Sequence, residues 1–279
     1  MNILTIAYYT VKRYSRNIIA IFAFILAPIL IISILTGSTE YKSYENINVQ
    51  EIQSEISNIH IDKKDNNKSN LKAFLIDINK GTINKNLKIS IACTLFFLFY
   101  GGLLMSYSII DDLKSNVHIR IKSSSVSFIE NFMGKFLGNI LILIICAFID
   151  VLIIKYGLNI NWNGNYFIIF LSLILFLIIV NSIGIIITVF FKNIYICALI
   201  FFAFNYSMVF PIMVNAFNPN KSEIIDIMSN LSFHNYVYKT ILADISNNIV
   251  LLQSSMTTLI VISIILFSMA LISGRRILR

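Results

Sequence analysis

Charged and polar side chains concentrate in one stretch of this chain, residues 108–136, which lies between two strongly apolar runs and reads SIIDDLKSNVHIRIKSSSVSFIENFMGKF. Carboxylates and basic side chains at such close spacing can dock on a charged partner surface or tie a loop to the end of a helix. The stretch supplies the main candidate functional residues: Asp111, Asp112, His118, Arg120, Lys122, Glu130 and Lys135.

No catalytic pattern accompanies these charges. The chain has no phosphate-binding loop, because its one Gly-Lys pair, Gly134-Lys135, is followed by Phe136 and lacks the preceding glycine. It also has no His-Glu-x-x-His, no Gly-x-Ser-x-Gly and no paired intramembrane aspartates. The histidines are scattered, and the three cysteines fall inside apolar runs. We therefore predict no catalytic residue, no metal and no cofactor in this chain.

The composition indicates a membrane protein. The chain is 57% hydrophobic and only 13% charged, whereas soluble domains carry roughly 25% charged residues. The net charge of +8 then reflects Lys and Arg at membrane borders rather than a nucleic-acid surface.

Six apolar runs approach or reach the length of about 20 residues that a helix needs to cross a bilayer. The first run is longer than the apolar core of a secretory signal, so we interpret it as an uncleaved span. Lys192-Asn193 joins the fourth and fifth runs as a tight hairpin. The sequence thus predicts an all-α integral membrane protein with a single transmembrane domain over residues 1–279. The runs are 18–35, 89–110, 136–154, 166–191, 194–217 and 249–272.

The short flanks of these runs are basic on one side of the membrane. Lys and Arg cluster before the first run, between runs two and three, and after the last run. The positive-inside rule therefore predicts that both termini and the 111–135 region face the cytoplasm of a bacterial cell, with the plasma membrane as location. The polar loop 37–88 is then outside.

Two further segments are expected to lie at the membrane surface. Ile3, Ala7, Thr10 and Tyr14 recur at helical spacing, which is typical of an amphipathic helix on the inner membrane surface. Segment 218–248 has two short apolar patterns with aromatic residues, so we predict two short, re-entrant-like outer helices before the last span.

Polar groups and glycines inside the apolar runs have alternative interpretations. Asp150 is either a snorkelling or locally paired carboxylate, or a contact in a substrate or ion path. Asn205 suits an interhelical hydrogen bond better than contact with a substrate, and with Asp150, Gly101 and Gly102 it is a candidate for the transport path or a dimer interface. Gly101 and Gly102 permit close helix approach, either within the chain or at a dimer seam, and we predict that spans two and five line a dimer interface. The same two alternatives apply to Gly134 with Gly138.

The pattern resembles the membrane subunit of ABC-2 type exporters. The likeness lies in the six spans, the N-terminal helix, the outer loop, and the region after span two: Asp111-Asp112, then a basic stretch at 118–122, then Gly134-Lys135 at span three. The chain departs from the commoner family pattern because serines at 123–125 stand where a proline is usual. The resemblance implies that 111–135 is a coupling region and that ATP and Mg are bound by a partner ATPase. It also implies a second permease subunit, in a homo- or heterodimer.

The residues agree with a coupling role. Ser127 followed by Glu130 predicts a capping box that fixes the start of span three. Arg120 and Lys122 would suit an acidic groove on the ATPase. The resemblance implies export of an amphipathic compound, such as an antimicrobial peptide, drug or lipid, with antibiotic resistance as a result. The alternatives are a plain positive-inside loop and an ATP-independent membrane protein, such as a secondary carrier or a sensor partner.

Overall fold

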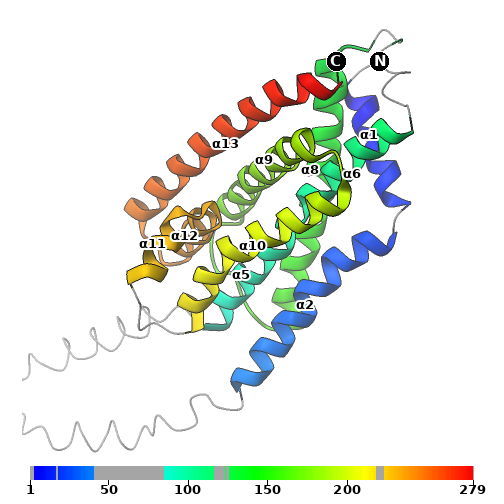
Figure 1. The fold of residues 1–279 in the computed structure, drawn as a ribbon. Coiled ribbons are helices and arrows are strands. Elements are labelled where there is room, and N and C mark those ends of the chain that lie inside the picture. The colour runs from blue at the N-terminus through cyan, green and yellow to red at the C-terminus, as the bar shows by residue number, and fades with distance from the viewer. Residues whose placement is uncertain are drawn as a thin grey trace, which may run out of the picture.

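Every regular element that the structure describes is an α-helix. The computed structural model describes residues 3–16, 18–40, 85–115, 123, 126–217 and 223–278. The helices form one bundle (Figure 1), and the predicted all-α fold is confirmed. The helices are α1 Ile3–Ser15, α2 Ile18–Glu40, α5 Lys85–Phe99, α6 Gly101–Lys114, α8 Phe128–Gly157, α9 Tyr166–Phe191, α10 Ile194–Phe217, α11 Glu223–Leu231, α12 Phe233–Ile245 and α13 Ile249–Leu278.

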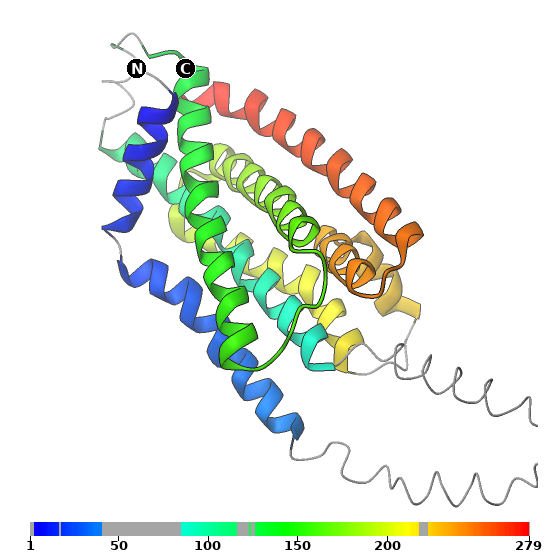
Figure 2. The ribbon, with the colours of Figure 1, turned by 180° about the vertical axis from the view of Figure 1, so that it is seen from behind.

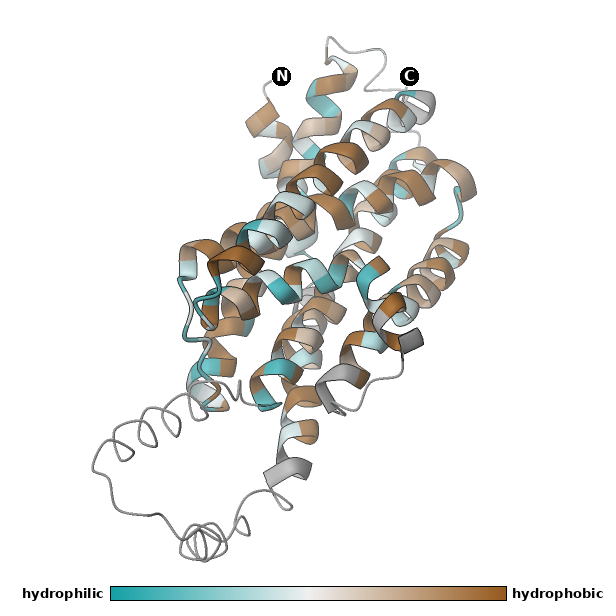
Figure 3. Cartoon of the chain, turned by 90° about the vertical axis from the view of Figure 1, so that its left-hand side faces the viewer, coloured by the Kyte–Doolittle hydropathy of each residue, from teal (hydrophilic) through white to brown (hydrophobic). Residues whose placement is uncertain are grey.

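Within the described part of the chain, five helical segments are long and apolar enough to cross a membrane. They coincide with the predicted spans two to six, and Figure 3 shows hydrophobic residues over most of their length. Helix α2 has 23 residues and lies where the first span was predicted. A multi-pass membrane protein is confirmed, while the total of six spans stays a prediction. The five segments are Lys85–Lys114, Phe128–Gly157, Tyr166–Phe191, Ile194–Val214 and Ile249–Arg275.

The two ends of the bundle contain different helix ends and connections. Helix α1, the end of α13 and the start of α8 lie together at one end, which we call the termini end (Figures 1 and 2). The connection between α8 and α9 lies at the other end, which we call the loop end. The described parts of these predicted cytoplasmic segments are therefore on one side of the bundle.

Helix α9 lies at the centre and packs against α6, α8, α10, α12 and α13. Small and polar side chains make this close packing feasible, as is common between helices in lipid. Gly184 lies directly against the backbone of Gly102 in α6, and Ser106 donates to the Gly184 carbonyl at 3.0 Å. The α9–α10 turn at Lys192 adopts a positive φ of 49° and ends α9, as the predicted tight hairpin requires.

Helices α11 and α12 lie in the predicted outer segment 218–248. The ring of His234, at the start of α12, is 5.1 Å from the rings of both Phe99 and Phe176. Phe176 lies about 15 Å along α9 from Tyr166, at 1.5 Å per residue. The junction of α11 and α12 therefore reaches well into the bundle before the chain returns to the loop end and enters α13.

Candidate functional site

Four charged side chains from three helices meet at the termini end. Arg13 of α1 donates from Nη1 to Asp112 Oδ1 at 2.8 Å and pairs through Nη2 with Asp111, both at the end of α6. Lys135 of α8 pairs with the other carboxylate oxygen of Asp112. We call Arg13, Asp111, Asp112 and Lys135 the ionic cluster. Asp112 is its centre, because it contacts cations from two different helices.

Burial divides the ionic cluster into an inner and an outer pair. The side chains of Asp112 and Lys135 are 4% and 7% exposed, whereas those of Arg13 and Asp111 are 34% and 41% exposed. Removing one partner from a buried ion pair leaves an uncompensated charge, which costs about 3–5 kcal/mol. A solvent-exposed pair contributes only about 0–1 kcal/mol. The inner pair therefore dominates the energetics of the ionic cluster.

The start of α8 is fixed by the predicted capping box. The Ser127 hydroxyl accepts from the Glu130 N–H at 3.2 Å, and the Glu130 carboxylate accepts from the Ser127 N–H at 2.9 Å. These two bonds satisfy backbone donors that a helix start otherwise leaves unpaired. Lys135 follows Glu130 by five residues, so the cap sets the position at which Lys135 reaches Asp112.

Helix α1 is tied to α6 at a second point. The Tyr14 hydroxyl donates to the Leu104 carbonyl at 2.7 Å. Burial raises the pKa of Tyr14, so the hydroxyl keeps its proton and remains a donor. Two neighbouring residues of α1, Arg13 and Tyr14, thus contact α6 about two turns apart.

Two glycines of α8 set the distance between α8 and α1. A Cβ atom at Gly138 would lie 2.7 Å from Thr10 Cβ and 2.9 Å from the Ala7 carbonyl oxygen. Gly134 is packed in the same way against Ile6. Of the two predicted roles for this glycine pair, the structure therefore assigns close packing within the chain.

The buried side of α1 faces α8 in the structure. Ala7, Thr10 and Tyr14 of the predicted face are buried inside the chain, whereas Leu4 and Tyr8 on the other side are 78% and 61% exposed. The helical spacing identified one face of α1, and α8 supplies against it a glycine surface that a single helix cannot reveal. The location of α1 on the inner membrane surface stays a prediction.

The structure brings together part of the predicted coupling region. Asp111, Asp112 and Lys135 meet directly, and Glu130 caps the helix that carries Lys135. His118, Arg120 and Lys122 lie outside the described residues. Their predicted contact with a partner stays a prediction.

Arg13 is the member of the ionic cluster that the sequence analysis did not single out. It was interpreted only as one of several basic residues that set membrane orientation. Its partners lie 98 and 99 residues later in the chain. The adjacent Tyr14, on the buried side of α1, was the available signal that this end of the helix packs against the bundle.

Asn205 makes the predicted interhelical hydrogen bond. At Tyr100 the backbone N–H bonds to the carbonyl of Phe97, three residues earlier, so the α-helical pattern is interrupted between α5 and α6. The interruption leaves the Phe96 carbonyl for another donor, and Asn205 Nδ2 supplies it at 2.8 Å. Asn205 thereby satisfies a backbone group that lipid could not.

Gly101 and Gly102 pack inside the chain. Gly101 lies against Leu143 of α8, and Gly102 against Phe201 of α10 and the backbone of α9. Close helix approach within the chain is thus their role in this structure. A dimer interface along spans two and five stays a prediction.

Asp150 is fully buried, which corrects one of its two interpretations. A snorkelling or locally paired carboxylate would reach water or a partner, but neither carboxylate oxygen has a hydrogen-bond partner among the residues described. The cause is its helical position, because Asp150 follows Cys146 by one turn on the buried side of α8. The role in a substrate or ion path stays a prediction.

In the described ranges, no group of three or more His, Cys, Asp or Glu side chains lies close enough to hold a metal ion. The predicted absence of a metal or cofactor is not decided by this observation and stays a prediction.

The comparisons with known proteins place the chain in a family. A sequence model of the family described as ABC-2 family transporter protein matches residues 31–272. The comparison with curated proteins finds no match. The matched region covers the ionic cluster except for Arg13, four of the five segments that can cross a membrane, and the fifth, Ile249–Arg275, up to residue 272. A match over most of the chain, on a helical membrane bundle, supports one conclusion: the chain belongs to the ABC-2 family of transporter proteins and is a membrane component of an ABC transporter.

Proposed function

We propose that this chain is the permease of a bacterial ABC exporter. It works as a dimer with two ATPase subunits, which bind ATP and Mg. It moves an amphipathic compound, such as an antimicrobial peptide, drug or lipid, out through the plasma membrane. Family membership supports the association with an ATPase. The direction, the substrate class and the dimer are the proposed part.

The ionic cluster is the observation that carries this proposal. Asp112 joins α1, α6 and α8 through Arg13 and Lys135, at the end of the bundle where α6 ends and α8 begins. A force on the 111–135 region would act on three helices at once, because their ends are tied together. In the proposed topology this end faces the cytoplasm, where the ATPase resides.

The basic stretch within 111–135 is the proposed docking element. Arg120 and Lys122 would contact an acidic groove on the ATPase. The inner pair of the ionic cluster would then pass the movement to spans two and three. Loss of Asp111 or Asp112 would leave hydrolysis uncoupled from transport.

The proposal is tested by reversing the basic charges, with Arg120→Glu and Lys122→Glu in one variant. Losing buried charge-assisted contacts costs about 2–5 kcal/mol at a partner surface, so the variant should lose most co-purification with the partner ATPase. Insertion should be unchanged, because the N-terminal segment, Lys135 and the tail still carry positive charge. Co-purification and stimulated ATP hydrolysis are the two readouts.

A double reversal in the tail, Arg275→Glu with Arg276→Glu, is the matched control. It changes the same number of charges on the same predicted side of the membrane but outside the 111–135 region, so it should retain the ATPase. If the 120/122 variant recruits and stimulates the ATPase as well as the tail variant does, the 111–135 region is only a solvated connector.

A further inference from the structure

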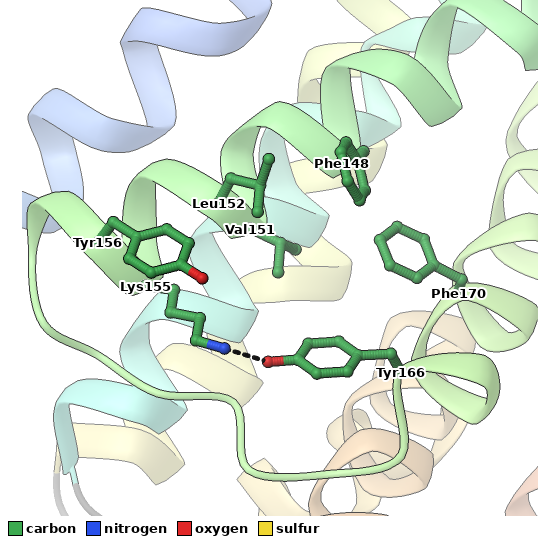
Figure 4. A pocket seen from close by; sticks show the side chains of 7 residues that line it. All are labelled: Phe148, Val151, Leu152, Lys155, Tyr156, Tyr166 and Phe170. Atoms are coloured by element: carbon green, nitrogen blue, oxygen red, sulfur yellow. Dashed lines mark hydrogen bonds between the residues drawn. The ribbon is translucent and has the colours of Figure 1, made fainter.

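A cavity of about 250 Å³ lies between α8 and α9 at the loop end (Figure 4). Its apolar part is formed by Phe148, Val151 and Leu152 of α8 and by Phe170 of α9. Phe148 and Leu152 are 48% and 37% exposed, so the cavity lies at the perimeter of the chain. In a membrane this perimeter faces lipid.

The polar part of the cavity is a lysine between two tyrosines. Lys155 Nζ donates to the Tyr166 hydroxyl at 2.7 Å, as Figure 4 shows. It also lies 5.4 Å from the ring centre of Tyr156 and 5.2 Å from that of Tyr166. No described carboxylate forms a salt bridge with Lys155. Since an ammonium group has three donors, Lys155 presents a positive charge and donor capacity to the cavity.

The polar part of the cavity is held in place by the connection between α8 and α9. The Asn165 side chain caps α9 by accepting from the Phe167 N–H at 3.0 Å, and the Asn165 N–H donates to Asp244 of α12 at 2.6 Å. Within the same connection, Trp162 Nε1 donates to the Ser90 hydroxyl of α5 at 3.0 Å. Tyr166 is therefore positioned before any ligand arrives, which lowers the cost of binding.

An apolar stripe continues from the cavity along α8. Leu141, Ile145, Phe148 and Leu152 follow one another at steps of three or four residues, and each is at least 37% exposed. Side chains at this spacing lie on one face of a helix. A hydrocarbon chain whose polar head lay at Lys155 could extend along this face.

We infer that the cavity binds an anionic phospholipid, with the phosphate on Lys155 and Tyr166 and an acyl chain on the α8 stripe. Charge complementarity selects this occupant, because a lysine without an acidic partner favours a lipid of net negative charge over a zwitterionic one. Tyrosines at the end of a membrane helix suit the depth of lipid head groups. The inference rests on the membrane placement in the proposed function and is independent of the ATPase.

The test measures which lipid the purified chain retains. The chain is incubated in detergent with equal amounts of phosphatidylglycerol and phosphatidylcholine, and retained lipids are counted by native mass spectrometry. The wild type should retain phosphatidylglycerol in preference. Lys155→Gln should lower that preference by about fivefold. Tyr166→Phe should lower it less, because the ring remains and only the hydroxyl is lost.

Lys239→Gln is the matched control. Lys239 is also half-buried and donates to a neutral side chain, Asn230 at 2.7 Å, but it lies on α12 away from the cavity. It should keep the wild-type preference. Equal retention of the two lipids by the wild type overturns the inference, as does an equal loss in both lysine variants. If Lys155→Gln changes the self-association of the chain and leaves lipid retention unchanged, Lys155 lies at a contact between protein copies and the inference is overturned. ATPase co-purification by the same samples tests the proposed function separately.

Discussion

Asp112 accepts hydrogen bonds from two cations on different helices, and its buried position makes that arrangement hard to replace. Asp112→Asn should lower the free energy of unfolding by about 3–5 kcal/mol, because Lys135 would remain buried without a counter-ion. Asp111→Asn should lower it by less than about 1 kcal/mol, since Asp111 is partly solvated. Denaturant unfolding of the purified chain in detergent measures both values.

The double variant Asp112→Asn with Lys135→Met separates charge from shape. Removing both charges should recover most of the stability lost in Asp112→Asn, because no uncompensated ion remains. Equal stability of the Asp112 and Asp111 single variants would show that the ionic cluster does not hold the helix ends together.

At the residue scale, the sequence predicted three of the four members of the ionic cluster and missed the fourth. Asp111, Asp112 and Lys135 could be selected because they border apolar runs that are close in sequence. Their pairing with each other was not predicted. Arg13 could not be selected, since its contact depends on how α1 packs on the bundle, and that packing is set by Gly134 and Gly138 on α8.

At the scale of elements, the α1–α8 contact depends on the absence of side chains on α8. Gly138→Ala should push α1 away, because the new Cβ would meet Thr10 and the Ala7 backbone at distances that require the backbone to move. Overpacking of this kind costs about 1–3 kcal/mol. Trypsin cleavage after Lys12 and Arg13 should become faster than in the wild type.

Gly157→Ala, at the other end of α8, is the control for that substitution. Its nearest neighbour, Ile153 Cγ2, would be 3.4 Å away, an ordinary contact. It should leave cleavage unchanged. Cleavage at the wild-type rate in the Gly138 variant would argue against tight packing of α1.

The positions of the long helices were predictable because apolar length alone defines a span. The interruption at Tyr100 was not predictable. It is stabilised by Asn205, which lies about a hundred residues later on another helix. The local sequence of α5 therefore gives no sign of it. The depth reached by α12 likewise depends on the ring contacts of His234 with Phe99 and Phe176.

At the scale of the whole molecule, the bundle predicts which segments share a side of the membrane. A cysteine at Ser123 should be labelled by an impermeant reagent only after the cells are opened, and one at Asn67 in intact cells. The native cysteines give little background, because Cys93, Cys146 and Cys197 are buried. Labelling of both sites from one side would refute the proposed topology.

Because the members of the ionic cluster are far apart in the sequence, they are synthesised at different times. Arg13 leaves the ribosome about a hundred residues before Asp111 and Asp112, and Lys135 follows later still. At about 5–20 residues per second, α1 waits on the order of 5–20 s before its carboxylate partners are synthesised. The N-terminal helix therefore completes its docking only after the third span has begun to form, so the first helix made is secured only after α2, α5 and α6 have been synthesised.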